Sequence, residues 1–262
     1  MLFKRELKRN LKSFLISTFI CSILITYIIS MSPSFGPDIK QILDLKFPSE
    51  MQLAFGMEGL DFNQSNSFFA MTFSYIYLFL AIYMTGVFAV IVSKEFSDKT
   101  AEYLFSLPAK RINIILTKLS VAFIYGFCSV LIIFLVSCLS FALIIKENYN
   151  LQPVLLMSVA WFMGGIAFGS IAFLLSSFFT RSKTVSSISI GFVLVMYLFQ
   201  IVISLNQNIS FLKYISPFDW FKGSKISNSG EISLTYCLIA IFVSAISLFF
   251  GVKRFKTMDV LV

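Results

Sequence analysis

The chain has 262 residues, of which 58% are apolar, and its mean hydropathy of +0.87 lies far above that of soluble globular domains. Charged residues make up 13%, and 21 Lys and Arg against 13 Asp and Glu give a formal net charge of +8. Histidine is absent, which excludes mechanisms that depend on an imidazole base or metal ligand. These values exclude a soluble globular protein, and they offer no catalytic residues and no metal site.

Six long stretches of the chain contain no charged residue, and each is long enough to cross a bilayer as a helix. A helix needs about 20 apolar residues to span the hydrocarbon core, whereas barrel strands are shorter and alternate in polarity. The sequence therefore predicts an all-α membrane protein that forms a single transmembrane domain over residues 1–262. The expected spans are Phe14–Met31, Phe68–Val92, Leu119–Ile145, Pro153–Phe179, Thr184–Leu205 and Ile232–Val252.

The residues before the first expected span combine an apolar face with a basic face. Leu2, Phe3, Leu7, Leu11 and Phe14 recur at helical spacing, and this pattern predicts an amphipathic helix in the inner membrane interface. Two interpretations stay open: the helix is a lever between cytoplasmic machinery and the first span, or it anchors the topology by attraction to anionic lipid. The basic face consists of Lys4, Arg5, Lys8, Arg9 and Lys12.

The distribution of basic residues predicts the orientation of the chain. Placing the N-terminus in the cytoplasm puts 15 of the 21 Lys and Arg residues on the cytoplasmic side. Cytoplasmic loops of membrane proteins carry an excess of Lys and Arg. We therefore expect both termini in the cytoplasm.

The inner loop between the second and third expected spans has the pattern of a short amphipathic helix. Ser97 or Asp98 is suited to cap its N-terminus, and Pro108 discourages its continuation. A helix held between two membrane helices fits a groove on another protein, and the alternative is an interfacial turn that has no partner. The shared apolar face consists of Ala101, Leu104 and Phe105.

A run of aromatic residues, Ser216–Phe221, lies in the last expected outside loop. Aromatic side chains near a span usually anchor it at the membrane interface, and this is the main interpretation. A re-entrant cap over a translocation path is the alternative.

Small residues in the fourth expected span predict close contact between helices. Gly165 and Gly169 have the Gly-x3-Gly spacing, and Gly164 lies beside them. Packing within the subunit is the main interpretation, and a subunit interface is the alternative.

The inner loop also carries a resemblance to a known family. Glu95, the Thr-x-Glu motif at Thr100–Glu102 and the residues that follow resemble the type-2 family of ABC-transporter permeases. Members of that family often have Gly where this chain has Lys99. The stretches Phe3–Leu7, Pro48–Gly56 and Ser216–Phe218 also resemble members of that family. The matching loop positions are Glu95, Thr100, Glu102, Leu104, Ser106, Pro108, Arg111 and Lys118.

The resemblance implies that the complete transporter contains further subunits. A cytosolic ABC ATPase would bind the inner loop, and a second permease subunit, identical or homologous, would complete the transporter. The chain has no Gly-x4-Gly-Lys-Ser/Thr motif, so ATP and Mg are expected on the partner ATPase and no cofactor is expected here. The implied ATPase-coupling residues are Glu95, Thr100, Ala101, Glu102, Leu104, Phe105, Pro108 and Arg111, and the implied translocation-path residues are Tyr75, Tyr83 and Gln200.

The expected function is that of a multi-pass permease in a bacterial plasma membrane. It would export a hydrophobic or amphipathic substrate, above all a toxin or antimicrobial peptide, and it would have the lipid bilayer but no nucleic acid as a partner. A stand-alone secondary carrier is one alternative, although such carriers usually hold ionisable groups within their spans and these spans have none. A passive immunity or scaffold protein is the other.

Overall fold

A computed structural model describes residues 2–34, 48, 52–53, 56–57, 59–60, 65–100, 110–146, 150–179, 181–205 and 212–257. Every regular element in these ranges is a helix, and they contain no strand. The six long helices are α1 (Leu2–Met31), α4 (Ser65–Ser97), α6 (Arg111–Ser140), α7 (Leu151–Ser176), α8 (Ser182–Leu205) and α11 (Leu234–Thr257). The short elements are η1 (Ser32–Ser34), the π-helical turn η2 (Phe141–Ile145), α9 (Pro217–Trp220) and α10 (Gly223–Ser229).

The six long helices confirm the prediction of six membrane spans. Each has at least 24 residues and is apolar enough to cross a membrane. The fourth expected span reaches Phe179, but α7 ends at Ser176, and the sixth begins at Ile232, two residues before α11. The remaining charge-free segments lie within α1, α4, α8 and the continuous run of α6 and η2.

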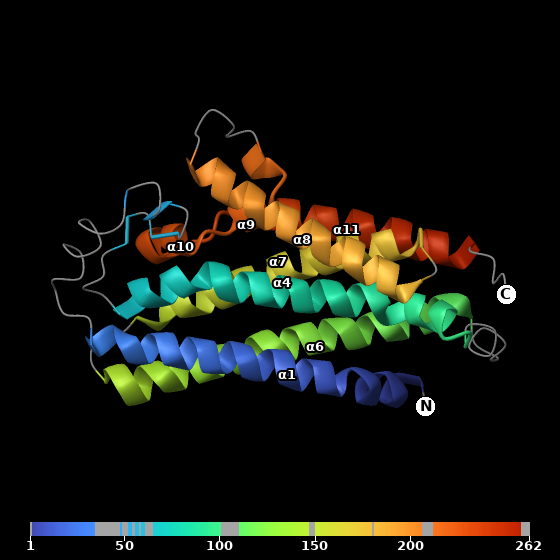
Figure 1. Ribbon diagram of the computed structural model, residues 1–262, viewed down its shortest axis with the longest axis horizontal. Coiled ribbons are helices and arrows are strands. Elements are labelled where there is room, and N and C mark those ends of the chain that lie inside the picture. The colour runs from blue at the N-terminus through green and yellow to red at the C-terminus, as the bar shows by residue number, and fades with distance from the viewer. Residues whose placement is uncertain are drawn as a thin grey trace.

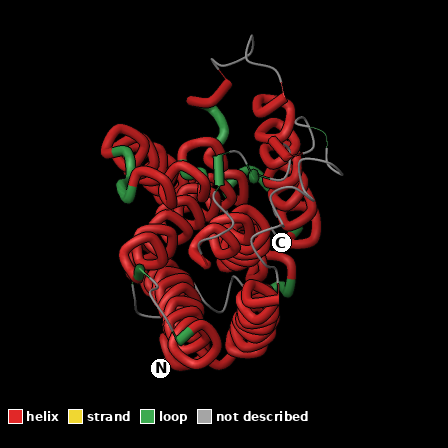
Figure 2. The backbone as a smooth tube through the Cα atoms, turned by 90° about the vertical axis from the view of Figure 1, so that its left-hand side faces the viewer, coloured by secondary structure: helices red, strands yellow, loops and turns green. Residues whose placement is uncertain are grey.

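Helices α4 and α7 form the centre of the bundle, and the other long helices surround them (Figure 1). The most apolar stretch of α4 is 72% buried and that of α7 is 61% buried, whereas the other four are only 22% to 28% buried. In a membrane protein, the exposed apolar faces of these four helices are available to lipid or to another subunit. Viewed along the bundle, the helices are seen nearly end-on (Figure 2).

Contacts between α4 and α7 explain the glycines of the fourth span. A Cβ atom at Gly164 would overlap the hydroxyl group of Tyr77, and a Cβ at Gly169 would lie 2.9 Å from a ring carbon of Phe88. Both aromatic side chains belong to α4. The glycines therefore serve packing within the subunit, as the main interpretation proposed.

The expected N-terminal amphipathic helix is present, but it is the first part of α1 and continues into the span without a break. Leu7 and Phe14 pack toward α6, where the Phe14 and Tyr125 rings lie 4.8 Å apart and the Tyr125 hydroxyl donates to the Leu7 carbonyl. Phe3 and Leu11 are exposed. The start of α1, the end of α4 and the end of α11 lie at one end of the bundle, called here the basic end (Figure 1).

The aromatic run before α10 is buried in protein, so the expectation of interface anchors is wrong for these residues. Phe218 of α9 is fully buried, with its ring 4.7 Å from that of Tyr77, 4.8 Å from Phe168 and 5.6 Å from Tyr197. The Tyr77 hydroxyl also donates to the Pro217 carbonyl at 3.1 Å. The segment thus enters the bundle between α4, α7 and α8, as a re-entrant element does.

An acidic side chain is buried with this aromatic segment. Oδ1 of Asp219 lies 2.8 Å from Nζ of Lys222, which also donates to the hydroxyl of Ser204. Within the described part of the chain, Oδ2 of Asp219 has no hydrogen-bond partner. Burial raises the pKa of Asp219 above its ordinary value, and the Lys222 ammonium group opposes that shift.

Candidate functional site

Three helices meet at the basic end and bring charged side chains into the protein interior. Glu6 lies in the second turn of α1, Glu95 in the last turn of α4, and Lys118 in the third turn of α6. Their side chains are only 0%, 2% and 1% exposed. Arg9 of α1 completes this group, called here the charge cluster, and Arg5 lies at its exposed rim.

The charge cluster is a closed ring of ion pairs. Nζ of Lys118 lies 2.7 Å from Oε1 of Glu6 and 2.8 Å from Oε1 of Glu95. The guanidinium group of Arg9 lies 2.6 Å from Oε1 of Glu95 and 2.7 Å from Oε2 of Glu6. Each carboxylate therefore contacts both cations, and Arg5 adds longer contacts of 3.5 Å and 3.3 Å to the same two acids.

The cost of burying charges limits how much the charge cluster can stabilise the fold. Removing four charges from water is costly, and their mutual attraction compensates only when the geometry is good and every charge is paired. In the ring each charge contacts an opposite charge, and the ion pairs join α1, α4 and α6. Among the described residues, Oε2 of Glu6 and Nε of Arg9 have no hydrogen-bond partner. Loss of a single member leaves an uncompensated buried charge, which is much more costly than loss of a surface ion pair.

The end of α4 explains how Glu95 is also connected to the inner loop. The Lys99 amide donates to the Phe96 carbonyl and the Thr100 amide donates to the Glu95 carbonyl, while Lys99 has a φ of +55°. This is the Schellman pattern that ends helices with a left-handed residue, which is usually glycine. The Thr100 hydroxyl also donates to the Glu95 carboxylate, so the side chain of Glu95 fixes the first residue after the turn.

The two residues expected to cap a helix of the inner loop lie at the end of α4. Ser97 is the last residue of α4, and Asp98 lies in the turn that ends the helix. The helix that they were expected to cap lies outside the described residues, so the capping role stays a prediction.

The structure describes three of the eight expected ATPase-coupling residues. It brings Glu95 and Thr100 into contact, and it places Arg111 at the first position of α6. The other five lie outside the described residues: Ala101, Glu102, Leu104, Phe105 and Pro108.

Sequence reasoning missed most of the charge cluster. It placed Arg9 on a basic face toward the membrane surface and gave Glu6 and Lys118 no role of their own, whereas the structure turns all three inward. One signal was available, because Glu6 is the only acidic residue among the first 37. A lone acid among basic residues at helical spacing is suited to face a cation on another helix.

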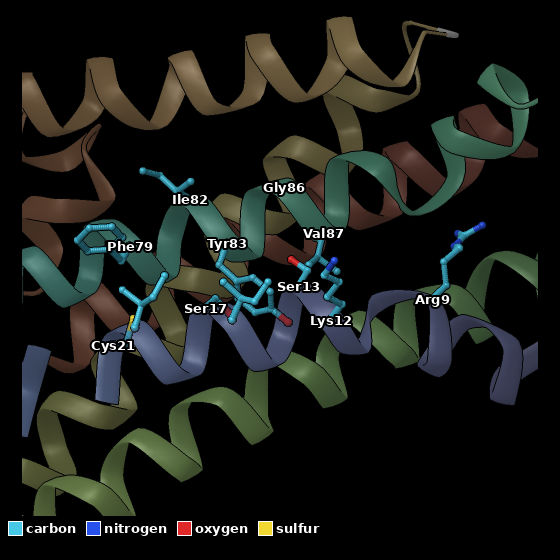
Figure 3. Close-up of a pocket in the computed structure, with 12 residues that line it drawn as sticks. Arg9, Lys12, Ser13, Ser17, Cys21, Phe79, Ile82, Tyr83, Gly86 and Val87 are labelled. Carbon is cyan, nitrogen blue, oxygen red and sulfur yellow. The ribbon is translucent and has the colours of Figure 1, made fainter. Parts of the chain in front are cut away.

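Of the three expected translocation-path residues, one lines a described groove, and their role in a path stays a prediction. Tyr83 lines a groove between α1 and α4, which Tyr75 and Gln200 do not line (Figure 3). Tyr75 is half-buried on α4, and Gln200 is largely buried on α8. Within the described residues, Oε1 of Gln200 has no hydrogen-bond partner.

The fold and the cluster define a multi-pass, all-helical membrane protein in which three helix ends are joined by buried charges. The chain matches the model of the ABC-2 family transporter proteins over residues 2–260, nearly its whole length, and it belongs to that family. It is therefore a membrane permease subunit of an ABC transporter, and the family implies a lipid bilayer and a partner ATPase. Among curated proteins, no sequence matches the chain.

Proposed function

We propose that this chain is the membrane subunit of an ATP-driven exporter in a bacterial plasma membrane, with its basic end in the cytoplasm. The ATPase binds the inner loop through the apolar face of Ala101, Leu104 and Phe105, and Glu102 makes a charged contact at the rim of the same groove. ATP and Mg are held by the ATPase, and a second permease subunit, identical or homologous, completes the translocation path. The proposed cargo is hydrophobic or amphipathic, above all a peptide.

The charge cluster is the observation that carries this proposal. In the chain, the inner loop follows the end of α4 and precedes the start of α6, and Glu95 and Lys118 lie near these two helix ends. Both side chains are paired with each other, and both contact charged residues of α1. A force applied to the loop by an ATPase would therefore act on α1, α4 and α6 together.

Three features support the proposed cargo and path. The outer helices α1, α6, α8 and α11 expose apolar side chains over most of their length, which suits a cargo that partitions into lipid. Tyr83 lines a groove that is open between two helices. Gln200 presents a buried carbonyl oxygen that has no partner among the described residues and is suited to accept a hydrogen bond from a peptide amide.

Co-purification tests the proposed ATPase partner. The tagged chain is extracted gently from its native membranes, and the bound proteins are identified by mass spectrometry for wild type, Leu104→Asp and Glu102→Gln. A buried apolar anchor contributes more binding energy than a solvated ion pair, so Leu104→Asp should lose a stoichiometric ATPase that Glu102→Gln retains. Absence of an ATPase from a folded wild-type chain, or equal retention in both variants, would contradict the proposal.

A further inference from the structure

A groove of about 620 Å³ runs between α1 and α4, starting beside the charge cluster. From α1 it is lined by Arg9, Lys12, Ser13, Ile16, Ser17 and Ile20, whose spacing of three and four residues defines one face of the helix. From α4 it is lined by Phe79, Ile82, Tyr83, Gly86 and Val87, which follow the same spacing. Two continuous helix faces thus enclose one elongated space.

The lining of the groove changes from polar to apolar along its length. Arg9 and Lys12 lie toward one end, Ser13 and Ser17 follow, and Phe79 and Cys21 lie toward the other end (Figure 3). An amphiphile with an anionic head and a hydrocarbon chain matches this order, because its charged group would face the basic side chains and its chain the apolar ones.

The polar end of the groove carries unneutralised positive charge. In the charge cluster and its rim, the two carboxylates of Glu6 and Glu95 face the three cations Arg5, Arg9 and Lys118, which leaves one positive charge in excess. Lys12 is exposed and makes no ion pair with any residue that the structure describes. Two positive charges are therefore available to a bound anion.

The groove also has the length and the free space that an acyl chain needs. Positions 9 to 21 of α1 cover about 18 Å at about 1.5 Å per residue, close to the roughly 15 Å thickness of one leaflet. A Cβ atom added at Gly86 would meet no heavy atom within 4 Å. The apolar side chains of Ile16, Ile20 and Phe79 are about half exposed along this space.

We propose that the α1–α4 groove binds one anionic phospholipid from the leaflet at the basic end. The phosphate contacts Arg9 and Lys12 with help from the hydroxyl groups of Ser13 and Ser17, and one acyl chain lies along Ile16 and Phe79. Basic pockets between membrane helices are suited to anionic headgroups. This site is separate from the binding of an ATPase, and the proposed orientation decides only which leaflet supplies the lipid.

Charge favours a lipid over a second copy of the chain as the occupant. A two-fold partner at the same depth in the membrane would bring a second Arg9 and Lys12 toward the first pair. Like charges repel, whereas a phosphate neutralises them.

Native mass spectrometry of the full-length chain in detergent tests this site. The chain is titrated with dioleoyl phosphatidylglycerol or with dioleoyl phosphatidylcholine, which carry the same acyl chains and differ in net charge. Wild type should bind the first phosphatidylglycerol several-fold more tightly than the first phosphatidylcholine. Lys12→Gln should reduce that preference about fivefold, since one basic residue near the surface contributes about 1 kcal/mol.

Matched variants separate the groove from the basic surface in general. Lys8→Gln removes the same charge from an exposed position of α1 that does not line the groove, and it should bind both lipids as wild type does. Gly86→Leu fills the groove and should lose the tightly bound lipid. Gly191→Leu, at a position of α8 that is equally open, should retain it.

Three outcomes would overturn the proposal. Equal affinity of wild type for the two lipids would exclude headgroup recognition. An equal loss of preference in Lys8→Gln and Lys12→Gln would show a diffuse electrostatic effect. A Gly86→Leu chain that keeps its lipid but changes from a dimer to a monomer would show that a second copy occupies the groove.

Discussion

At the scale of single residues, the burial of Lys118 is energetically demanding. It is a cation with almost no exposed surface, and it is tolerated because Glu6 and Glu95 both lie within 2.8 Å of its ammonium group. Its pairing with two other helices also makes it the residue whose loss should affect the cluster most.

Replacing Lys118 with Met should destabilise the chain by about 3–5 kcal/mol, because two buried carboxylates would then share only the arginines. The measurement is thermal unfolding of the purified chain in detergent. Lys110→Met removes the same charge from an exposed position and should change stability by no more than about 0.5 kcal/mol. Adding Glu6→Gln to Lys118→Met should cost less than the sum of the single changes. Equal stability of the two lysine variants would contradict a buried cluster.

Asp219 should make stability depend on pH in a defined direction. Burial raises the pKa of Asp219 in the folded state. Its stabilising contribution to the free energy of unfolding is therefore present below the unfolded pKa of about 4 and is lost as the pH rises through the folded-state pKa. Unfolding of wild type and Asp219→Asn is compared between pH 4 and pH 8, where the variant should gain stability relative to wild type as the pH rises. A constant difference between wild type and Asp219→Asn would refute the assignment.

At the scale of helices, the contact between α4 and α7 depends on the absence of a side chain. Gly164 lies against the hydroxyl group of Tyr77, which is itself held by its hydrogen bond to Pro217 and by the ring of Phe218. The tyrosine therefore has little freedom to move away from an added methyl group.

Gly164→Ala should lower stability by about 1–3 kcal/mol through overpacking. Gly191→Ala adds the same methyl group to α8 in open space and should raise stability by up to about 1 kcal/mol, because alanine is the better helix former. Both are measured as shifts in thermal unfolding. The packing account fails if the two variants shift in the same direction.

The helices could be predicted from sequence because each span is a charge-free run longer than a bilayer requires. The ends were harder, since α4 ends in a left-handed turn at Lys99, where a glycine would have given a clear signal. The continuity of α1 was also missed, because an amphipathic segment followed by an apolar one is compatible with either one helix or two. The burial of Phe218 depends on partners in three different helices, which local patterns do not reveal.

The candidate site was predicted only in part for a similar reason. Glu95 and Thr100 lie five residues apart, and the pattern of the inner loop drew attention to both. The pairing of Glu6 with Lys118 joins residues 112 positions apart, and only the fold brings them together. Charge counts along the sequence showed where the cations lie, but they did not show which of them turn inward.

At the scale of the whole molecule, the bundle has a buried centre and two kinds of outer surface. Helices α4 and α7 form the centre, while α1, α6, α8 and α11 present apolar faces to lipid or to a second subunit. The charge cluster lies at the basic end, where α1, α4 and α6 meet. The Phe218 segment packs into the bundle between α4, α7 and α8.

The most direct test of the central claim is site-specific photo-crosslinking in intact cells. A photoreactive phenylalanine derivative is placed at Leu104 in the inner loop or at Tyr214, which is exposed at the opposite end of the bundle. The account predicts that the probe at Leu104 is cross-linked to an ABC ATPase and that the probe at Tyr214 is not. A folded chain that gives no ATPase adduct from Leu104, or gives one from Tyr214, would contradict the account.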